Sequence, residues 1–339
     1  MRPEFLEILI CPECRQRFTL LEPTFGTGGA IASGTLRCAC GTYPVVDSIP
    51  RILRGAAAAS PAVRGEAEAL KERSQRSFGY QWTRFGRMVC SFEENFLNYI
   101  APIGEEFFYG KRGLDVGCGF GRHLINAARF GAEMVGADYS RAIDVSASNV
   151  GEMKNVDLVQ ADAYRLPFPP GRFDFAYCLG VLHHLPDPER AFQCVVDTVK
   201  PGGAVFIWVY SDSRRVVNAC LKAVRRVTTR LPFPLVTRLS QLAALVDWAF
   251  FIGPYRLLRR WRPLRGLVEA LFFSRVKMYA EYPFQVSVAD WFDRLAAPIR
   301  FYYNAGHMQE WARRANLVNV RISPTGKYGW RVFGERPGA

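Results

Sequence analysis

Short apolar runs recur through the middle of the chain, and each is followed by a segment long enough to form a helix. Four of these runs cover residues 133–138, 157–162, 173–178 and 204–210. Runs of this length, spaced by helix-length segments, are typical of buried parallel strands joined by crossover helices. The pattern therefore predicts an α/β core with a parallel sheet over residues 111–210.

The C-terminal region has a different pattern, a helix followed by two strands. A helix is expected over residues 306–316, and the apolar runs 317–323 and 329–334 are separated by a short loop that contains proline and glycine. Two runs this close together predict an antiparallel pair, which would complete a seven-stranded sheet.

A glycine-rich turn follows the first apolar run of the core. Residues 113–122 read Gly-Leu-Asp-Val-Gly-Cys-Gly-Phe-Gly-Arg. Glycine permits a positive φ and removes the Cβ that blocks close approach, and the helix expected from Arg122 offers unpaired N–H groups at its start. The turn differs from the G-x-G-x-x-G dinucleotide fingerprint and lacks a G-K-[ST] ending. It predicts a nucleotide-like cofactor that lies against bare backbone.

Acidic residues end the next two apolar runs. Asp138 ends the second run and Asp162 ends the third. In a βαβ unit, an acid at the end of the second strand is placed to accept hydrogen bonds from both ribose hydroxyls. A second interpretation makes both acids helix caps or turn residues.

Five signals in this order resemble the class I S-adenosylmethionine-dependent methyltransferases, in particular methyltransferase type 11. They are the glycine-rich turn, the two acids, the segment 179–188 and the Lys-Pro-Gly-Gly turn at 200–203. The resemblance covers roughly residues 111–210 and implies a Rossmann-like seven-stranded sheet with S-adenosylmethionine as cofactor. It implies Asp115, Gly117, Gly119 and Gly121 around the methionine moiety, Asp138 at the ribose, Tyr139 along the adenine, Asp162 and Ala163 at the adenine amino group, and Leu179 and Gly180 over the reactive end.

Two histidines are the candidate catalytic residues. A sulfonium already carries a good leaving group, so the protein mainly aligns donor with acceptor and excludes water. His183 and His184 follow the fourth run, where the methyl group should project, and imidazole titrates near neutrality. The alternative is that the His-His-Leu stretch only shapes the loop.

The N-terminal residues carry two cysteine pairs. Cys11 and Cys14 form a C-x-x-C motif, and Cys38 and Cys40 form a C-x-C motif about a hairpin's length further on. Such pairs suit a tetrahedral zinc site, which would supply folding energy to a segment with little core of its own. The segment resembles the zinc ribbons that activate certain tRNA and release-factor methyltransferases, although these usually carry C-x-x-C as the second pair. A metal-free ribbon and a disulfide are the alternatives.

Cysteine usage favours a reducing compartment. The chain has nine cysteines, an odd number, and the other five are scattered through expected core elements. The first residues also lack the pattern of a signal peptide, because Glu4 and Glu7 interrupt the apolar stretch before Cys11. We therefore expect a cytoplasmic protein.

The segment between the cysteine pairs and the core is expected to be a linker followed by a helix. Residues 55–61 are rich in alanine and read as a linker, and residues 63–76 read as a polar helix. The aromatic residues after it, Phe78, Tyr80 and Trp82, are expected to cap the cofactor or acceptor cleft, or else to pack this helix on the sheet.

Most of the positive charge lies in one insert. The chain carries a net charge of +13, and residues 211–283 contain 12 Arg and 2 Lys against 2 Asp and 2 Glu. Arginine alternates there with bulky apolar residues, as in amphipathic helices. Four interpretations remain open: a lid over an acceptor, an anionic membrane surface, an RNA contact, and a solvated arginine face. The run 242–252 contains Asp247 and is too short to span a bilayer.

The sequence thus predicts a zinc-ribbon-fused methyltransferase that acts on oxygen, nitrogen or carbon of a small or lipid-like acceptor. tRNA methylation and a noncatalytic, cofactor-binding activator are the alternatives. The localisation expected is cytoplasmic or peripheral at a membrane. The predicted domains are a zinc-ribbon-like domain at 1–54, a linker with N-terminal helices at 55–110, the cofactor-binding core at 111–210, a basic helical insert acting as a lid at 211–289, and a segment completing the sheet at 290–339.

Overall fold

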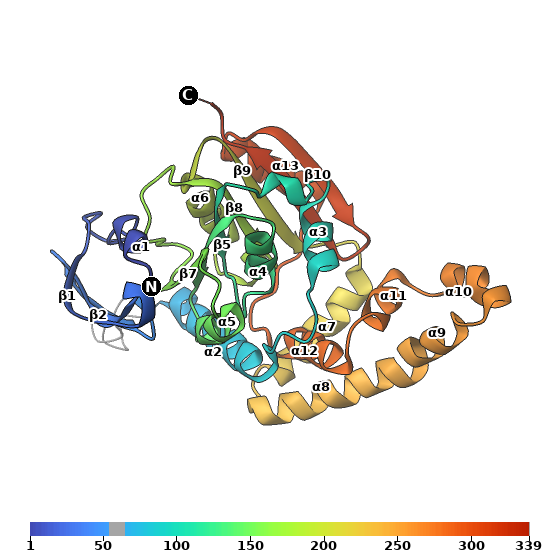
Figure 1. The fold of residues 1–339 in the computed structure, drawn as a ribbon. Helices are drawn as coiled ribbons and strands as arrows, with labels where there is room; N and C mark the ends of the chain where they lie inside the picture. The colour runs from blue at the N-terminus through green and yellow to red at the C-terminus, as the bar shows by residue number, and fades with distance from the viewer. Residues whose placement is uncertain (54–64, 339) are drawn as a thin grey trace.

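A computed structural model describes residues 1–53 and 65–338 of the chain. The expected linker at 55–61 and the start of the expected helix at 63–76 lie outside the described residues. The described strands form a mixed sheet in the order β1-β2-β3-β4-β7-β6-β5-β8-β9-β11-β10, and helices lie on both sides of its central part (Figure 1).

The centre of the sheet is a Rossmann-like α/β unit. Strands β5 to β9 pair in parallel, and β11 pairs antiparallel with β9. The strands and the helices that connect them are β5 (Arg112–Val116), α4 (Arg122–Arg129), β6 (Glu133–Asp138), α5 (Ala142–Val150), β7 (Val156–Ala161), β8 (Phe173–Leu179), α6 (Pro188–Asp197), β9 (Val199–Tyr210), α13 (Ala305–Arg314), β10 (Val318–Thr325) and β11 (Gly329–Glu335).

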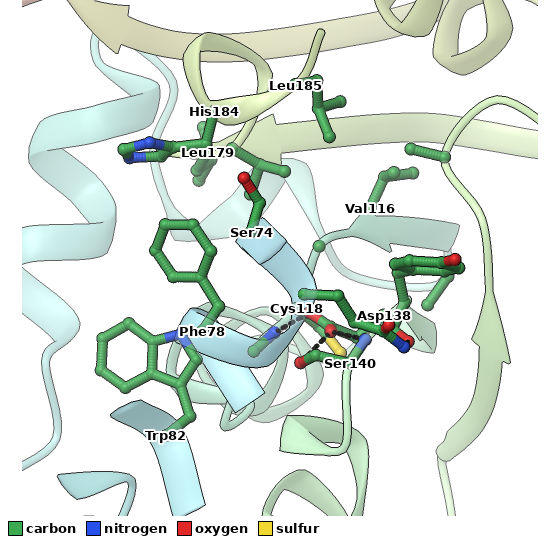
Figure 2. A pocket seen from close by; sticks show the side chains of 18 of the residues that line it. Ser74, Phe78, Trp82, Val116, Cys118, Asp138, Ser140, Leu179, His184 and Leu185 are labelled. Atoms are coloured by element: carbon green, nitrogen blue, oxygen red, sulfur yellow. Dashed lines mark hydrogen bonds between the residues drawn. The ribbon is translucent and has the colours of Figure 1, made fainter. Parts of the chain in front are cut away.

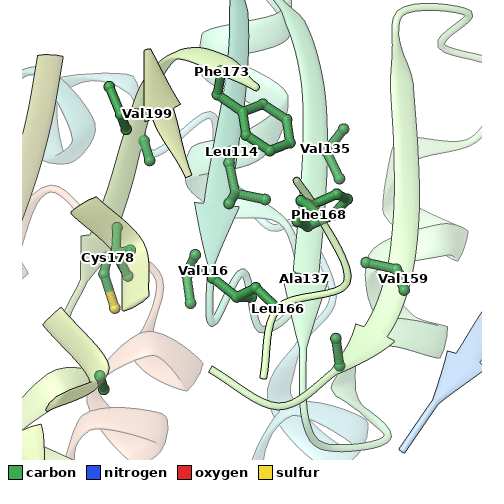
Figure 3. Packing of buried hydrophobic residues seen from close by; sticks show 14 of the residues in the cluster. Leu114, Val116, Val135, Ala137, Val159, Leu166, Phe168, Phe173, Cys178 and Val199 are labelled. Atoms are coloured by element: carbon green, nitrogen blue, oxygen red, sulfur yellow. The ribbon is translucent and has the colours of Figure 1, made fainter. Parts of the chain in front are cut away.

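Burial explains why these strands read as apolar runs. A parallel strand with helices on both faces has no solvent face, so both sets of alternating side chains are apolar. Leu114 and Phe173 are fully buried, and Val135 and Val159 pack in the same cluster (Figure 3). The order β7-β6-β5-β8-β9 places the change of winding direction between β5 and β8, where ligands bind in sheets of this kind.

The sheet has more strands than the seven predicted. The N-terminal elements are α1 (Pro3–Glu7), β1 (Thr19–Phe25), β2 (Ile31–Cys38), β3 (Gly41–Val46) and β4 (Ile49–Ile52), and β4 pairs in parallel with β7. Leu9 and Leu36 belong to the same apolar cluster as Val159, and Arg2 forms an ion pair of 2.6 Å with Asp157. The N-terminal segment therefore buries its few apolar side chains against the core, because so short a segment has little interior of its own.

Helices cover the end of the sheet where β5 to β8 finish. α2 (Glu66–Phe85) crosses this end, and α3 (Glu93–Ile100) lies beside β9 and β11. The chain between β9 and α13 forms α7 (Arg215–Thr228), α8 (Phe233–Asp247), a π-helical segment at Trp248–Ile252, α9 (Gly253–Leu258), α10 (Arg265–Leu271), α11 (Ser274–Ala280) and α12 (Phe284–Ala296). Short 3-10 turns occupy Thr27–Gly29, Glu105–Phe107, Leu182–His184 and Arg262–Leu264.

Candidate cofactor and acceptor site

A cavity lies at the carboxyl ends of β5, β6, β7 and β8, beneath α2 (Figure 2). Loop residues after each strand form one wall, and side chains of α2 form the other. The loop residues that line it include Gly117, Cys118, Gly119, Asp138, Tyr139, Ser140, Asp162, Ala163, Leu179, Gly180 and Val181, and the α2 residues are Lys71, Ser74, Gln75, Phe78 and Trp82.

The turn after β5 depends on glycine at two positions. Gly117 and Gly121 have φ values of +79° and +87°, a region that favours glycine. A Cβ on Gly117 would lie 2.5 Å from Val181 Cγ2, and one on Gly121 would lie 2.7 Å from Ser146 Oγ. Larger residues are therefore excluded by conformation and by space, so the turn presents bare backbone to the cavity, which suits a nucleotide-like ligand.

Asp138 ends β6 with its carboxylate held in place by three donors. The Gly119 N–H donates to Oδ2 at 2.9 Å, and the N–H and hydroxyl of Ser140 both donate to Oδ1 at 2.7 Å (Figure 2). Burial raises the pKa of Asp138 above its usual range, while these hydrogen bonds oppose that rise. The carboxylate is thus fixed at the mouth of the glycine turn and still has lone pairs for a ligand.

Asp115 lies behind this wall. Its side chain is buried on β5, and it does not line the described cavity. Burial, together with the charge of Asp138, raises the pKa of Asp115 well above its usual range. The structure therefore places Asp115 under the glycine turn. The fold brings the other nine predicted cofactor residues together: eight of them line the cavity, and Gly121 lies at the start of α4.

Asp162 has a partner that the sequence did not reveal. Lys71 Nζ of α2 forms an ion pair with Asp162 Oδ2, and the Tyr164 N–H donates to Oδ1 at 3.0 Å. The same ammonium group lies 4.8 Å from the centre of the Tyr139 ring. No signal in the sequence identified Lys71, because it is one of several charged residues on a polar helix.

The aromatic residues of α2 divide between two tasks. Phe78 and Trp82 point into the cavity (Figure 2). Tyr80 points the other way and packs against Phe292, with ring centroids 5.5 Å apart. Helical spacing explains the split, since residues 78 and 82 share a face and residue 80 lies on the opposite one. Phe78 and Trp82 are therefore placed to cap the cavity, whereas Tyr80 packs the helix on its neighbours.

The two candidate histidines also have different surroundings. His184 lines the cofactor cavity and also a second cavity next to it. His183 is fully buried, packs 4.1 Å from the Tyr210 ring by centroid distance, and lines neither of these two cavities. A proton acceptor must reach the reacting atoms, so of the two histidines only His184 is placed for that task.

His184 has a close neighbour at each ring nitrogen. Nδ1 lies 2.7 Å from the Ile299 carbonyl oxygen, and Nε2 lies 3.5 Å from Asp293 Oδ1 of α12. Burial lowers the pKa of His184 to about 4. Burial alone would raise the pKa of Asp293, but the neighbouring charges, chiefly that of Arg300, and the hydrogen bond from Tyr210 together bring the pKa below its usual range. Sequence reasoning missed Asp293 as a site residue, since it lies more than 100 positions away on an amphipathic helix.

The second cavity is rich in aromatic side chains. Its walls share Phe78, Trp82, Phe120, Arg122, Gly180 and His184 with the cofactor cavity, and add Phe92, Tyr99, Trp208, Tyr210, Tyr279 and Asp293 among others. Tyr99 and Trp208 are stacked, with ring centroids 4.5 Å apart and an angle of 12° between planes. A flat apolar molecule in this cavity would lie next to the ligand of the first.

The four N-terminal cysteines are brought together by the fold. Their sulfur atoms all lie within 4.8 Å of one another, with Cys11 Sγ 3.3 Å and Cys38 Sγ 3.4 Å from Cys40 Sγ. Tetrahedral zinc with Zn–S bonds of about 2.3 Å separates its sulfur ligands by about 3.8 Å. The sulfur atoms of the C-x-C pair and of the C-x-x-C pair therefore surround one point, and these four donors fit a zinc ion.

The sheet order, the glycine turn after β5, and the acids at the ends of β6 and β7 define a class I S-adenosylmethionine-dependent methyltransferase. The family model described as "Methyltransferase domain" matches residues 114–207. A ubiquinone biosynthesis O-methyltransferase of Pectobacterium atrosepticum is 33% identical over 197 residues, which cover 54% of this chain and 75% of that protein. The chain belongs to the S-adenosylmethionine-dependent methyltransferases.

Other similar proteins carry related names. A ubiquinone biosynthesis O-methyltransferase of Shewanella halifaxensis is 36% identical over 132 residues, or 38% of this chain, and the match spans 54% of that protein's length. A solved structure of an S-adenosylmethionine-dependent methyltransferase from Aquifex aeolicus has a TM-score of 0.40 and 14% identity, covering 80% of this chain and 98% of that one.

Proposed function

We propose that this protein transfers the methyl group of S-adenosylmethionine to a hydroxyl oxygen of a small, flat, apolar acceptor. One observation carries the proposal: His184 Nε2 and Asp293 Oδ1 lie 3.5 Å apart at the acceptor cavity, and neither has a donor of its own. A carbonyl only accepts hydrogen bonds, so the contact with Ile299 requires the His184 proton on Nδ1. Nε2 therefore carries a lone pair at neutral pH.

Two acceptors that face each other need a donor between or beside them. Asp293 Oδ2 already accepts from the Tyr210 hydroxyl at 2.9 Å and faces Arg300 at 3.0 Å, whereas Oδ1 is buried without a hydrogen-bond partner in the described structure. A buried acceptor without a partner is costly, so a ligand that brings an O–H group is favoured here. An acceptor hydroxyl meets this requirement.

The same pair supports the transfer chemistry. S-adenosylmethionine supplies an electrophilic methyl group on a sulfonium. The acceptor oxygen forms a bond to the methyl carbon as the carbon–sulfur bond breaks, and His184 Nε2 takes the hydroxyl proton. The negative charge of Asp293 then stabilises the imidazolium, which later releases the proton to solvent. The products are a methyl ether and S-adenosylhomocysteine.

The first cavity is assigned to the cofactor. Asp138 would accept the ribose hydroxyls, Tyr139 would lie beside the adenine, and Asp162 with the Ala163 backbone would meet the adenine amino group. The glycine turn, Leu179 and Gly180 would enclose the methionine end. We also assign a structural zinc ion to the four N-terminal cysteines.

The relatives support an oxygen acceptor. Several similar proteins are named ubiquinone biosynthesis O-methyltransferases, and a phenolic hydroxyl suits the aromatic walls formed by Tyr99 and Trp208. The acceptor itself is left as a class, a phenol or enol with a flat apolar body.

The test is a transfer assay with methyl-labelled cofactor and a panel of phenols and catechols, followed by identification of the product. We expect a methyl ether, and a loss of at least about 100-fold in kcat for His184→Gln while the cofactor still binds, because general base catalysis contributes about 10²–10⁴-fold. His307→Gln, at an exposed position on α13, is the matched control. Label in RNA, or in an N- or C-methylated product, would refute the proposal.

A further inference from the structure

Helices α8, α9 and α10 form an arm that extends away from the sheet. We define the arm as residues 233–273, and Figure 1 shows α8 and α9 running in one direction with α10 beyond them. One face of α8 packs on the body, with Val236 and Ala244 buried and Val236 in a cluster with Phe292 of α12. The far part packs against α11, because Ile252, Tyr255 and Val268 share one apolar cluster with Val276 and Tyr279. The arm is thus folded and attached along one side.

The opposite face of the arm exposes large apolar side chains. Phe250 is 70% exposed and Trp261 is 62% exposed. The other exposed ones are Leu235, Leu242, Leu245, Val246, Phe251, Leu257, Leu267, Leu271 and Phe273. So many large apolar side chains exposed on one part of a protein mark an interaction site. These residues are not displaced core residues, since the arm already buries other apolar side chains against α11 and α12.

Positive charge accompanies this apolar face. The arm contains six arginines and two acids, Asp247 and Glu269. Both acids are occupied inside the fold: Asp247 pairs with Arg275 at 2.8 Å, and Glu269 pairs with Lys277 at 3.1 Å. Arg260, Arg262 and Arg265, at the far end, are exposed and have no ion-pair partner within the described residues. Apolar side chains flanked by unpaired arginines are typical of helices that lie in the interface of an anionic bilayer.

The arm does not have the surroundings of a membrane-spanning helix. The prediction that residues 242–252 are too short to span a bilayer was wrong, because residues 233–258 form one helix that is long and apolar enough to cross a bilayer, with 28% of its most apolar window buried in the protein. Asp247, in the middle, is fixed by Arg275 and accepts a hydrogen bond from the Trp291 indole at 2.7 Å. Moving this helix across a bilayer would break these contacts and expose an acid to lipid. A helix that lies flat on the membrane surface would keep the contacts of Asp247 with Arg275 and Trp291.

We infer that the arm docks on an anionic membrane surface, with its apolar face in the headgroup region and its arginines against lipid phosphates. A second copy of this chain suits the face less well, because a two-fold contact would bring unpaired arginines from both copies together. RNA would satisfy the arginines and leave the leucine and phenylalanine side chains in water. A bilayer satisfies both kinds of side chain.

The arm also forms part of a cavity wall. Tyr255 and Glu269 line a cavity of about 660 Å³ together with Trp208 and Tyr210, which also line the acceptor cavity. A docked arm would therefore place this cavity next to the lipid surface, where an amphiphilic acceptor resides. This consequence rests on the proposed methyl transfer, whereas the docking itself does not.

Vesicle co-sedimentation without cofactor or acceptor tests the docking. We expect the protein to bind vesicles of phosphatidylcholine mixed with phosphatidylglycerol, and to be released as salt screens the arginines. The variant Arg260→Glu/Arg262→Glu/Arg265→Glu should bind at least about 100-fold more weakly, because each basic side chain near an anionic surface contributes about 1 kcal/mol, or about fivefold. Phe250→Ser/Leu257→Ser should also weaken binding, and a salt rinse should then release the protein more readily.

The control is Arg17→Glu/Arg37→Glu/Arg129→Glu, which makes the same change in charge at exposed positions outside the arm. It should bind vesicles nearly as well as the original protein. No binding to anionic vesicles, equal loss in the control, or arm variants that instead abolish self-association or tRNA binding would overturn the inference. Methyl transfer to a soluble phenol, measured separately, reports on the proposed function alone.

Discussion

Replacing Asp138 by alanine tests the cofactor site most directly. Hydrogen bonds of 2.7–2.9 Å from Gly119 and Ser140 fix the carboxylate of Asp138. The lone pairs that remain free therefore have a fixed orientation for accepting hydrogen bonds from a ribose. Each hydrogen bond to a charged acceptor contributes about 1.5–3 kcal/mol. Burial raises the pKa of Asp138, which means that the site disfavours the charged carboxylate. We therefore use the lower end of this energy range for each hydrogen bond to Asp138.

Two bonds of this strength contribute about 3 kcal/mol together, and Asp138→Ala should raise the S-adenosylmethionine Kd by about 100-fold. Isothermal titration calorimetry measures the change. Ser140→Ala is the matched control, since it removes one donor to Asp138 and leaves the carboxylate in place, and it should raise the Kd by less than about tenfold. Circular dichroism and a cooperative thermal transition confirm the fold. An unchanged Kd in folded Asp138→Ala protein would remove Asp138 from the site and refute the assignment of the cavity.

Three further predictions follow from the same geometry. Gly117→Ala should abolish cofactor binding in calorimetry while the chain still folds, because a Cβ at φ +79° would lie 2.5 Å from Val181 Cγ2; retained affinity would contradict the need for bare backbone. Protein prepared without chelator should carry about one zinc per chain by metal analysis, and Cys11→Ser/Cys14→Ser should release it while cofactor still binds; absence of zinc would leave a metal-free ribbon. Burial lowers the pKa of His184 to about 4, so the unfolded chain, with a histidine pKa of about 6.5, takes up the proton first as the pH falls. Stability should therefore decrease from about pH 6.5 to pH 4, by up to about 3 kcal/mol in urea titrations, and His184→Gln should remove that part of the loss; an identical pH profile in the variant would refute the buried neutral state.

Local rules in the sequence determined the core strands, the glycine turn and the acids at the strand ends. Parallel strands finish at one edge of a sheet, so residues such as Asp138 and Asp162 lie close together there. Their placement does not depend on how distant segments of the chain pack. A glycine required by its own φ, such as Gly117, is likewise a local property. These features need only short-range pattern and a fixed handedness of connection.

Contacts between distant segments were decided by the tertiary structure alone. Helix packing brings Asp293 to His184 and buries His183 behind it, although the two histidines are adjacent and chemically identical in the sequence. Lys71 reaches Asp162 only because α2 crosses the sheet. The apolar pattern of the arm likewise indicated a helix. It did not indicate which face of the helix would be exposed, because the exposed face depends on where α12 packs. Burial and pairing depend on what the rest of the chain places next to a residue, and a local sequence pattern carries no such information.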